Sequence, residues 1–323
     1  MSWSARLGVV ELGRDEPELI VVVGPTASGK SELALQLAAR HDGEIVGADS
    51  VHVYRGFDIG SNKPTKEERA RAPHHLIDVA DAREPLDAAS YTALAERAIE
   101  ETRERGKVPI VVGGTFLWVR ALLYGLANAP PGNPAIRARH DAWQKAEGRS
   151  ALHAALARVD ASTAARIAPN DFVRVSRALE VFELTGRPLS AWHADHGFRQ
   201  PRYRAKLTGV RFTPEALTLR IVARTQRALA AGWVGEVEHL VAAGYRDTRA
   251  MSSVGYRQVL AFLEGRLGEG ELALAIDRAT RIFARRQRTW LRDEPVEWID
   301  PVPGQVIAPM RKLPPNGTAP RPW

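Results

Sequence analysis

The segment GPTASGKS at residues 24–31 constrains the fold of this chain more than any other feature. It matches the pattern G-x-x-x-x-G-K-[ST], follows an apolar run and opens a stretch with helical spacing. The glycines of such a loop let the backbone curl until several N–H groups point inward, and the helix start adds positive potential. The segment therefore predicts a phosphate-holding loop in preference to a plain glycine-rich turn. Its residues are Gly24, Pro25, Thr26, Ala27, Ser28, Gly29, Lys30 and Ser31.

Two side chains of this loop carry chemistry that its backbone cannot supply. Lys30 is a mobile cation suited to the terminal phosphate of a ligand, and the Ser31 hydroxyl can bind Mg²⁺. We therefore expect Mg²⁺ as the cofactor, with Ser31 as its ligand from the protein. The loop by itself does not identify the phosphate donor.

Short apolar runs alternate with helical stretches along most of the chain. The runs lie at 19–23, 44–48, 75–79, 108–112, 205–212 and 296–299. Such runs, when separated by helices, are typical of buried parallel strands. The fold class that we expect is α/β, with a P-loop NTPase-like core whose parallel sheet is flanked by helices, plus an inserted all-helical domain.

A change of composition sets the expected domain boundaries. Residues 130–201 are rich in Ala, Arg and Leu with helical spacing and contain no convincing strand. They predict a helical insertion between two segments of the catalytic core, residues 18–129 and 202–300. Residues 1–17 are expected to form an N-terminal extension, and the Pro-rich residues 301–323 a disordered tail.

Composition excludes several classes of function. The 323 residues include no cysteine, which rules out disulfides, thiolate zinc sites and cysteine nucleophiles. No run approaches the roughly 18 apolar residues of a membrane span, and the N-terminus lacks a signal-peptide core. We therefore expect a cytoplasmic protein without a membrane partner. The net charge of +7 indicates a polyanionic partner only where basic residues cluster.

The position of one carboxylate distinguishes this chain from a typical ATPase. An ATPase usually carries an acid at the end of a neighbouring strand, but the run at 108–112 ends in Gly113-Gly114-Thr115. The acid instead follows the run at 44–48, as Asp49. This placement suggests a base that acts on a substrate, although a helix cap or turn residue is an equal alternative at this point.

Seven motifs are long enough to compare with known families. They are GPTASGKS, ADSVHVYRGFDIG at 48–60, PHHLIDV at 73–79, VGGTFLWVRALLYGL at 112–126, APNDFVRVSRALEVFELTG at 168–186, VGYRQVLAFLEG at 254–265 and ATRIFARRQRTWLR at 279–292. Together they closely resemble the tRNA dimethylallyltransferases, in the expected order over roughly residues 19–300. The resemblance implies transfer of a dimethylallyl group from dimethylallyl diphosphate to N6 of adenine 37, in tRNAs that read codons beginning with U. It also implies Mg²⁺ and recognition of the tRNA anticodon stem-loop, and we expect the enzyme to be a monomer.

The resemblance also implies roles for particular residues. Lys30 and the loop amides would stabilise the diphosphate leaving group, and Arg220 would close over it. Asp49 would accept a proton from N6, while Thr115 would orient the same amine. Further positions match tRNA contacts of the family. They are Ser50, Val51, His52, Arg137, Val173, Arg174, Val175, Ser176, Arg177, Gly255, Tyr256, Arg257 and Gln258, besides Asp49 and Thr115.

Arginines recur along the last predicted helix in steps of three and four. Arg278, Arg281, Arg285, Arg288 and Arg292 would therefore share one face, which suits an RNA backbone. The opposite face should pack on the core through Leu272, Ile276, Ala279, Phe283 and Trp290. A shorter stripe of Arg220, Arg224 and Arg227 could equally be structural.

A few positions depart from the family pattern. His52 replaces a common Gln, Ser61-Asn62 replaces Thr-Ala, and Phe116 and Trp118 replace a smaller residue and Tyr. We expect these positions to lie in or beside the substrate region, where they would influence prenyl-chain and anticodon preference.

Three other functions remain open from the sequence. A prenyltransferase of free adenosine nucleotides shares the phosphate loop and the Asp-Ser pair, but the helical insertion and the basic helix disfavour it. A small-molecule kinase that uses ATP, or an RNA-binding protein without catalysis, is less consistent with the motifs.

Overall fold

The computed structural model describes residues 19–198 and 200–300. The predictions of an N-terminal extension at 1–17 and a disordered tail at 301–323 lie outside these residues. The described chain forms two compact units, one of residues 19–123 with 202–300 and one of residues 124–201. The helical unit thus begins at Tyr124, earlier than the predicted boundary at residue 130.

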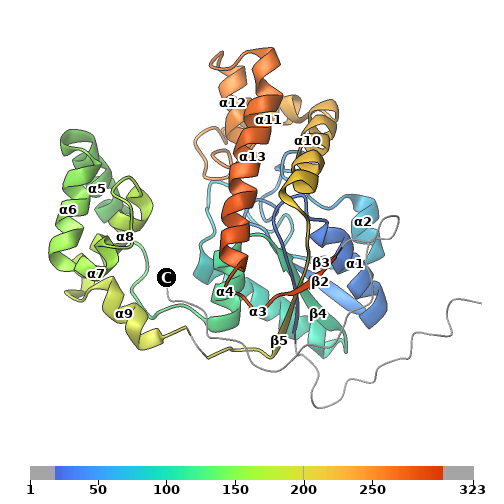
Figure 1. The fold of residues 1–323 in the computed structure, drawn as a ribbon, viewed down its shortest axis with the longest axis horizontal. Helices are drawn as coiled ribbons and strands as arrows, with labels where there is room; N and C mark the ends of the chain where they lie inside the picture. The colour runs from blue at the N-terminus through green and yellow to red at the C-terminus, as the bar shows by residue number, and fades with distance from the viewer. Residues whose placement is uncertain (1–18, 199, 301–323) are drawn as a thin grey trace, which may run out of the picture. The chain divides into compact units, whose positions relative to one another are not determined.

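The first unit is built on a six-stranded parallel sheet (Figure 1). Its strands are β1 (Leu19–Val23), β2 (Gly43–Ala48), β3 (His74–His75), β4 (Val108–Gly113), β5 (Ala205–Val210) and β6 (Glu297–Ile299). Their order across the sheet is β3-β2-β4-β1-β5-β6, and every pairing is parallel. All residues of β1 and β2 are buried, as expected for strands covered on both faces. The predicted α/β fold with a P-loop NTPase-like core is confirmed.

The expected strand at 75–79 is wrong, because β3 contains only His74 and His75. Leu76 and Asp78 have positive φ angles of 61° and 58°, which interrupt an extended strand. The Asp78 carboxylate is also held by an ion pair with Lys63, at 2.5 Å, and by one with Arg69, at 3.0 Å. The segment is therefore a cross-linked turn. The strand predicted at 205–212 likewise ends at Val210.

Helices cover both faces of the sheet (Figure 1). Helix α1 (Lys30–His41) packs Leu33 and Leu37 against Ile20 and Val22 of β1. Side chains alternate along a strand, so Val21 points to the opposite face, where α3 (Ala88–Glu104) and α4 (Phe116–Tyr124) lie. Helix α2 (Lys66–Arg71) is short and begins with a Thr65–Glu68 capping box.

Four further helices gather above the carboxyl ends of the strands (Figure 1). They are α10 (Pro214–Ala230), α11 (Trp233–Ala242), α12 (Tyr256–Leu263) and α13 (Glu269–Leu291). Ligands of open α/β sheets bind at this end of the strands. The four helices therefore supply the second wall of any site built on the phosphate loop.

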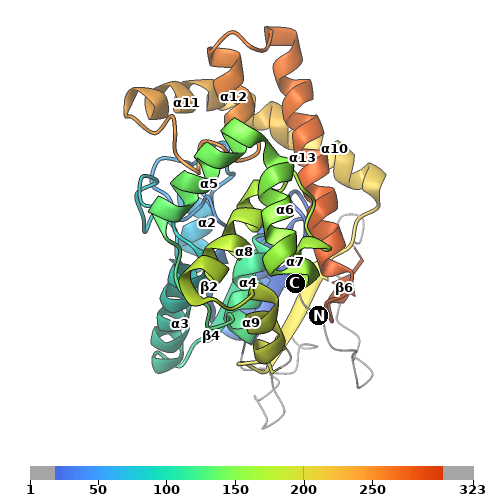
Figure 2. The same cartoon turned by 90° about the vertical axis from the view of Figure 1, so that its left-hand side faces the viewer.

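The helical unit contains α5 (Pro134–Glu147), α6 (Arg149–Val159), α7 (Ala161–Ala164), α8 (Phe172–Thr185) and α9 (Leu189–His196), which Figure 2 shows from a second direction. Leu152, Leu156, Val175 and Leu179 form its apolar core, so α6 and α8 bury their apolar faces against each other. In neither described unit is a helix both long and apolar enough to cross a membrane.

Candidate active site

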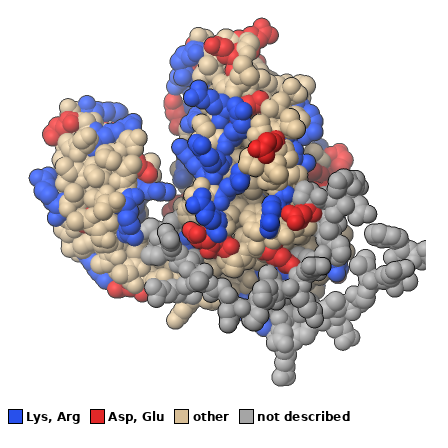
Figure 3. All heavy atoms as spheres, viewed as in Figure 1, with Lys and Arg blue, Asp and Glu red and all other residues tan. Residues whose placement is uncertain are grey.

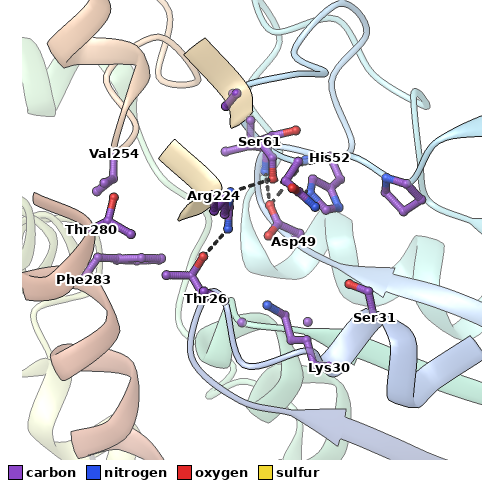
Figure 4. Close-up of a pocket in the computed structure, with 18 of the residues that line it drawn as sticks. Thr26, Lys30, Ser31, Asp49, His52, Ser61, Arg224, Val254, Thr280 and Phe283 are labelled. Atoms are coloured by element: carbon purple, nitrogen blue, oxygen red, sulfur yellow. Dashed lines mark hydrogen bonds between the residues drawn. The ribbon is translucent and has the colours of Figure 1, made fainter. Parts of the chain in front are cut away.

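A cavity of about 790 Å³ lies at the carboxyl ends of β1, β2 and β4. The phosphate loop, the Asp49–His52 turn and Thr115 line one side of it, and α10 and α13 line the other. The structure thus brings together all four residues expected to be catalytic, namely Lys30, Asp49, Thr115 and Arg220. Figure 4 shows Lys30, Asp49 and Arg224 directed toward the same space.

The phosphate loop has the backbone conformation that its sequence predicts. Ala27 and Gly29 have positive φ angles of 64° and 79°, which turn the chain sharply between β1 and α1. The left-handed angle at Gly29 suits a glycine, and a Cβ there would lie 3.4 Å from Arg220. The Ser28 hydroxyl is 1% exposed and lacks a hydrogen-bond partner among the described residues. The hydroxyl lies against Gly24, where an added Cβ would be 2.5 Å from the Ser28 Oγ.

Lys30 lies against this loop in a largely desolvated position. Burial lowers the pKa of its ammonium group from 10.5 to about 8, although the nearby Asp49 carboxylate opposes the shift. Arg224 lowers the same pKa further. The group is therefore a cation near neutral pH that gains stability when a negative ligand binds.

The Asp49 carboxylate is held by the turn that follows β2. Its Oδ1 accepts the backbone N–H of Val51 at 2.9 Å and that of His52 at 3.4 Å. Burial raises the pKa of Asp49, but the charges of His52 and Lys30 and these N–H bonds outweigh burial and hold it below its ordinary value. Oδ2 has no hydrogen-bond partner in the described part of the chain. One oxygen thus fixes the carboxylate and the other can accept a proton.

Thr115 lies two residues after the end of β4, and its side chain is hydrogen-bonded to Ser50, the residue after Asp49. The Thr115 hydroxyl accepts a hydrogen bond from the Ser50 N–H at 3.0 Å and donates one to the Ser50 hydroxyl at 3.2 Å. The Thr115 N–H also donates to the Ala48 carbonyl at 3.2 Å. These bonds hold the ends of β2 and β4 together at the edge of the cavity.

Gln287 is a site residue that the sequence did not identify. It is 5% exposed on α13, where its Oε1 accepts the Thr26 N–H and its Nε2 donates to the Gly114 carbonyl, both at 2.8 Å. A single amide thus ties the phosphate loop to the end of β4. Its spacing, four residues after Phe283 and three before Trp290, places it on the core-facing side of the helix but does not reveal its hydrogen-bond partners.

Two arginines of α10 reach the cavity from the opposite wall. The Arg220 Nε donates to the Ala27 carbonyl at 2.7 Å, which places this guanidinium on the phosphate loop. Arg224, which the sequence left undecided, donates to the Thr26 hydroxyl and to the Ser61 carbonyl, the latter at 3.2 Å. Arg224 therefore belongs to the site and is not only a structural residue.

The positions that depart from the family pattern fall into two groups. His52 and Ser61 line the cavity, and the His52 Nε2–H donates to the Ser61 carbonyl at 3.0 Å. Burial lowers the pKa of His52, although the Asp49 carboxylate opposes the shift. Phe116 and Trp118 are buried and do not line the cavity, although Phe116 directly follows Thr115, and Trp118 stacks on Tyr91 at 4.3 Å between ring centroids. Their influence on prenyl-chain and anticodon preference stays a prediction.

The arginine stripe of α13 is exposed along its whole length, and Figure 3 shows basic side chains gathered over this helix. Arg281, Arg285, Arg288 and Arg292 make no side-chain hydrogen bond or ion pair with any other described residue. On the other face, Leu272, Ile276 and Ala279 are buried as predicted. Phe283 is 38% exposed and lines the cavity, so its assignment to the core is wrong. It faces the space above the phosphate loop, where Figure 4 places it beside Thr280.

Several predicted tRNA contacts on α8 have side chains that a partner cannot reach. Val175 and Ser176 are 1% and 3% exposed, and Ser176 is bonded to His140 at 2.9 Å. These two side chains support the helical core, because they point from α8 toward α5 and α6. Val173 is 75% exposed and Arg174 is also exposed, so these two can meet a partner.

Arg137 and Arg177 share one acidic partner. The Glu180 carboxylate is fully buried and pairs with Arg137 at 2.9 Å and with Arg177 at 2.6 Å. Their charges therefore already compensate a buried anion, and about half of the Arg137 side chain remains exposed.

The residues of the predicted contact segment around α12 differ in exposure, and their contact with tRNA stays a prediction. Tyr256 is fully buried, and the Gln258 Oε1 accepts the Gly255 N–H at 2.8 Å. Gly255 has a φ angle of 94°, and a Cβ there would lie 2.2 Å from Trp233. In this segment only Arg257 has an exposed side chain.

The fold and the position of the cavity define a class of protein. A parallel sheet, a phosphate loop at the end of β1 and an acid after β2 place the chain among the P-loop NTPase-like α/β proteins. Residues 52–294 match the family described as IPP transferase. The chain belongs to this family.

Individual relatives agree with this assignment. The tRNA dimethylallyltransferase of Sorangium cellulosum is 60% identical over 282 residues, which cover 87% of this chain and 90% of the relative. That of Geobacter metallireducens is 47% identical and covers 88% and 93%. The solved tRNA isopentenylpyrophosphate transferase of Bacillus halodurans has a TM-score of 0.65 and 35% identity, over 87% of this chain and 89% of that one. A eukaryotic dimethylallyltransferase acting on tRNA has a TM-score of 0.72 and 26% identity, and the match covers 87% of this chain and 73% of that one.

Proposed function

We propose that this chain is a tRNA dimethylallyltransferase, which transfers a dimethylallyl group from dimethylallyl diphosphate to N6 of adenine 37 in tRNAs that read codons beginning with U. The observation that carries the proposal is the presence of Lys30 and Asp49 in one cavity. Lys30 is a cation on the phosphate loop. Asp49 is a carboxylate whose Oδ2 is available to an amine that enters the cavity. The names of the relatives supply the donor and the acceptor.

The first half of the reaction takes place at the phosphate loop. The allylic C–O bond breaks, its electron pair stays with the diphosphate, and positive charge develops on the terminal carbon. Loop N–H groups and Lys30 stabilise the departing negative charge, and the free Nη groups of Arg220 can bind it from the α10 side. Phe283 lines the same cavity and provides an apolar contact for the prenyl chain.

The second half takes place beside Asp49. The N6 nitrogen forms the new C–N bond with the allylic carbon and thereby becomes cationic and acidic. The free Oδ2 of Asp49 accepts the proton. A carboxylate with a lowered pKa is a weak base, but it is sufficient once the nitrogen carries positive charge. Because Asp49 lies inside the cavity, the adenine must leave the stack of the anticodon loop to reach it.

The residues around Ser31 are consistent with Mg²⁺ held chiefly by the substrate. Among residues 19–198 and 200–300, no group of three or more His, Asp or Glu side chains forms a metal site. Magnesium bound to phosphates commonly takes only one or two ligands from the protein, and the Ser31 hydroxyl lines the cavity next to Lys30. When bound, the ion would neutralise charge on the diphosphate.

The arginine stripe of α13 supports an RNA partner. We expect the triple variant Arg281→Gln/Arg285→Gln/Arg288→Gln to raise the KM for tRNA about tenfold or more, with binding of dimethylallyl diphosphate unchanged. The slope of log K for tRNA binding against log salt concentration should also become shallower by about one for each phosphate contact that is lost. Steady-state kinetics measures the change in KM, and filter binding at several salt concentrations measures the change in slope. Arg40→Gln and Arg97→Gln, on other exposed helices, are the control.

Parallel incubations separate the proposed function from its rivals. The enzyme, Mg²⁺ and labelled dimethylallyl diphosphate are incubated with unmodified tRNA or with AMP, and a further incubation contains ATP labelled at its γ-phosphate. The proposal expects label on tRNA at adenine 37 and diphosphate release without ATP hydrolysis. Label on AMP alone would establish the free-nucleotide rival, and γ-phosphate transfer from ATP would establish a kinase.

A further inference from the structure

The carboxylate of Glu236, on α11, lies outside the reacting groups but accepts an unusual number of hydrogen bonds. It accepts the backbone N–H groups of Asp58, Ile59 and Gly60, at 3.0, 2.6 and 3.2 Å. It also accepts the Tyr256 hydroxyl at 2.6 Å. Four donors use nearly the full accepting capacity of one carboxylate. The segment 58–60 is thus attached to α11 by its backbone and not by its side chains.

Neighbouring contacts leave this segment little freedom to move. A Cβ on Gly60 would lie 1.9 Å from the Trp233 ring, so the segment rests directly on α11. The Tyr256 hydroxyl, which donates to Glu236, accepts the Ser61 N–H at 3.2 Å. The next residue after the segment is therefore fixed by the same network.

The carbonyl of Ser61 connects this network to the cavity. It accepts hydrogen bonds from Arg224, at 3.2 Å, and from the His52 Nε2–H, at 3.0 Å. Arg224 also donates to the Thr26 hydroxyl of the phosphate loop, and Figure 4 shows it beside Asp49. The Ser61 carbonyl thus orients both Arg224, which reaches the phosphate loop, and His52, which lies beside Asp49.

We propose that Glu236 is a positioning residue, which fixes the Ser61 carbonyl and thereby holds Arg224 and His52 in place between the phosphate loop and Asp49. This inference rests on the proposed function, since it assigns Arg224 to the diphosphate and His52 to the carboxylate side. A glutamine in place of Glu236 has the same shape but presents an NH₂ group to at least one of the four donors. That donor loses its partner, and the segment must shift to restore it.

The test compares Glu236→Gln with Glu238→Gln, a substitution of the same type two residues along α11 at an exposed position. We expect Glu236→Gln to lower kcat/KM for dimethylallyl diphosphate about tenfold to 100-fold, as misplacement of binding groups does elsewhere. Calorimetric affinity for inorganic diphosphate should fall as well, and Glu238→Gln should match the wild type in both measurements. In the double variant Glu236→Gln/Arg224→Gln, the fold-loss of kcat/KM should be smaller than the product of the two single fold-losses. Both substitutions act through the Arg224 guanidinium, so their effects are not independent.

The outcomes separate failure of this inference from failure of the proposed function. If wild-type enzyme does not label tRNA, the proposed function fails, while diphosphate affinity still tests Glu236. If Glu236→Gln retains wild-type affinity and rate, or if its loss multiplies fully with that of Arg224→Gln, the positioning role is wrong. Should Glu236→Gln not fold, Tyr256→Phe removes one of the four donors to Glu236, together with the acceptor of the Ser61 N–H, and is expected to give a smaller loss in the same direction. A wild-type affinity in Tyr256→Phe would then overturn the proposal.

Discussion

Asp49→Asn is expected to lower kcat for prenyl transfer by about 10²–10⁴-fold, the usual contribution of a general base. The asparagine can keep the bonds from the Val51 and His52 N–H groups through its oxygen, so the turn after β2 should survive. The amide nitrogen then replaces Oδ2 and cannot accept the proton from N6. Single-turnover transfer of labelled dimethylallyl to tRNA measures the loss.

Two controls restrict the interpretation of this result. Binding of tRNA and of diphosphate to Asp49→Asn should stay close to wild type, and Asp247→Asn, at an exposed position, should retain full activity. A kcat of Asp49→Asn within a few-fold of wild type would show that Asp49 is not the base. Asp49 would then be only a turn residue, the alternative that the sequence left equally open.

The pH dependence of the wild type offers a second test of the same group. Because the pKa of Asp49 lies below its ordinary value, the carboxylate stays ionised under mildly acidic conditions. The base is present above this lowered pKa and is lost as pH falls through it. The acid limb of kcat/KM should therefore lie at a lower pH than an ordinary aspartate would give.

Lys30→Met should lower kcat/KM for dimethylallyl diphosphate by about 10²–10³-fold, as removal of one preorganised charge-stabilising donor does in other enzymes. The methionine retains much of the side-chain volume, so the loss reports the charge. Steady-state kinetics with saturating tRNA measures it, and tRNA affinity should be unaffected. An unchanged kcat/KM would mean that the loop amides and Arg220 suffice.

The pKa of Lys30, about 8 without ligand, adds a prediction about alkaline solution. The pKa is lowered, so the ammonium charge is present below about pH 8 and is lost as pH rises through that value. The KM for dimethylallyl diphosphate should therefore increase above about pH 8. Lys30→Arg keeps its charge at that pH and should flatten this increase, even if its overall rate is lower.

Local patterns in the sequence were enough to predict the framework of the site. The phosphate loop, the acid after β2 and the glycine pair after β4 each follow a short apolar run. The carboxyl ends of parallel strands meet at one edge, so these residues had to converge. Helical spacing also predicted the exposed arginine stripe of α13, although Arg286, outside that stripe, is exposed as well.

Residues that depend on distant contacts were not predictable in this way. Gln287 bonds to Thr26, 261 positions away, and Glu236 bonds to Ile59, 177 positions away. Neither belongs to a local motif. The incorrect assignment of Phe283 has a related cause, because this residue has the spacing of a core residue but meets a cavity.

Helix α13 has a consequence for attempts to alter the RNA preference of this protein. Its outer side presents Arg285 and Arg288 to solvent, whereas Gln287, between them in the sequence, holds the phosphate loop from inside. One inserted or deleted residue would rotate everything beyond it by about 100°. Redesign of the RNA surface must therefore use substitutions that keep the length of α13. A change of helix length would break the hydrogen bond between Gln287 and the phosphate loop.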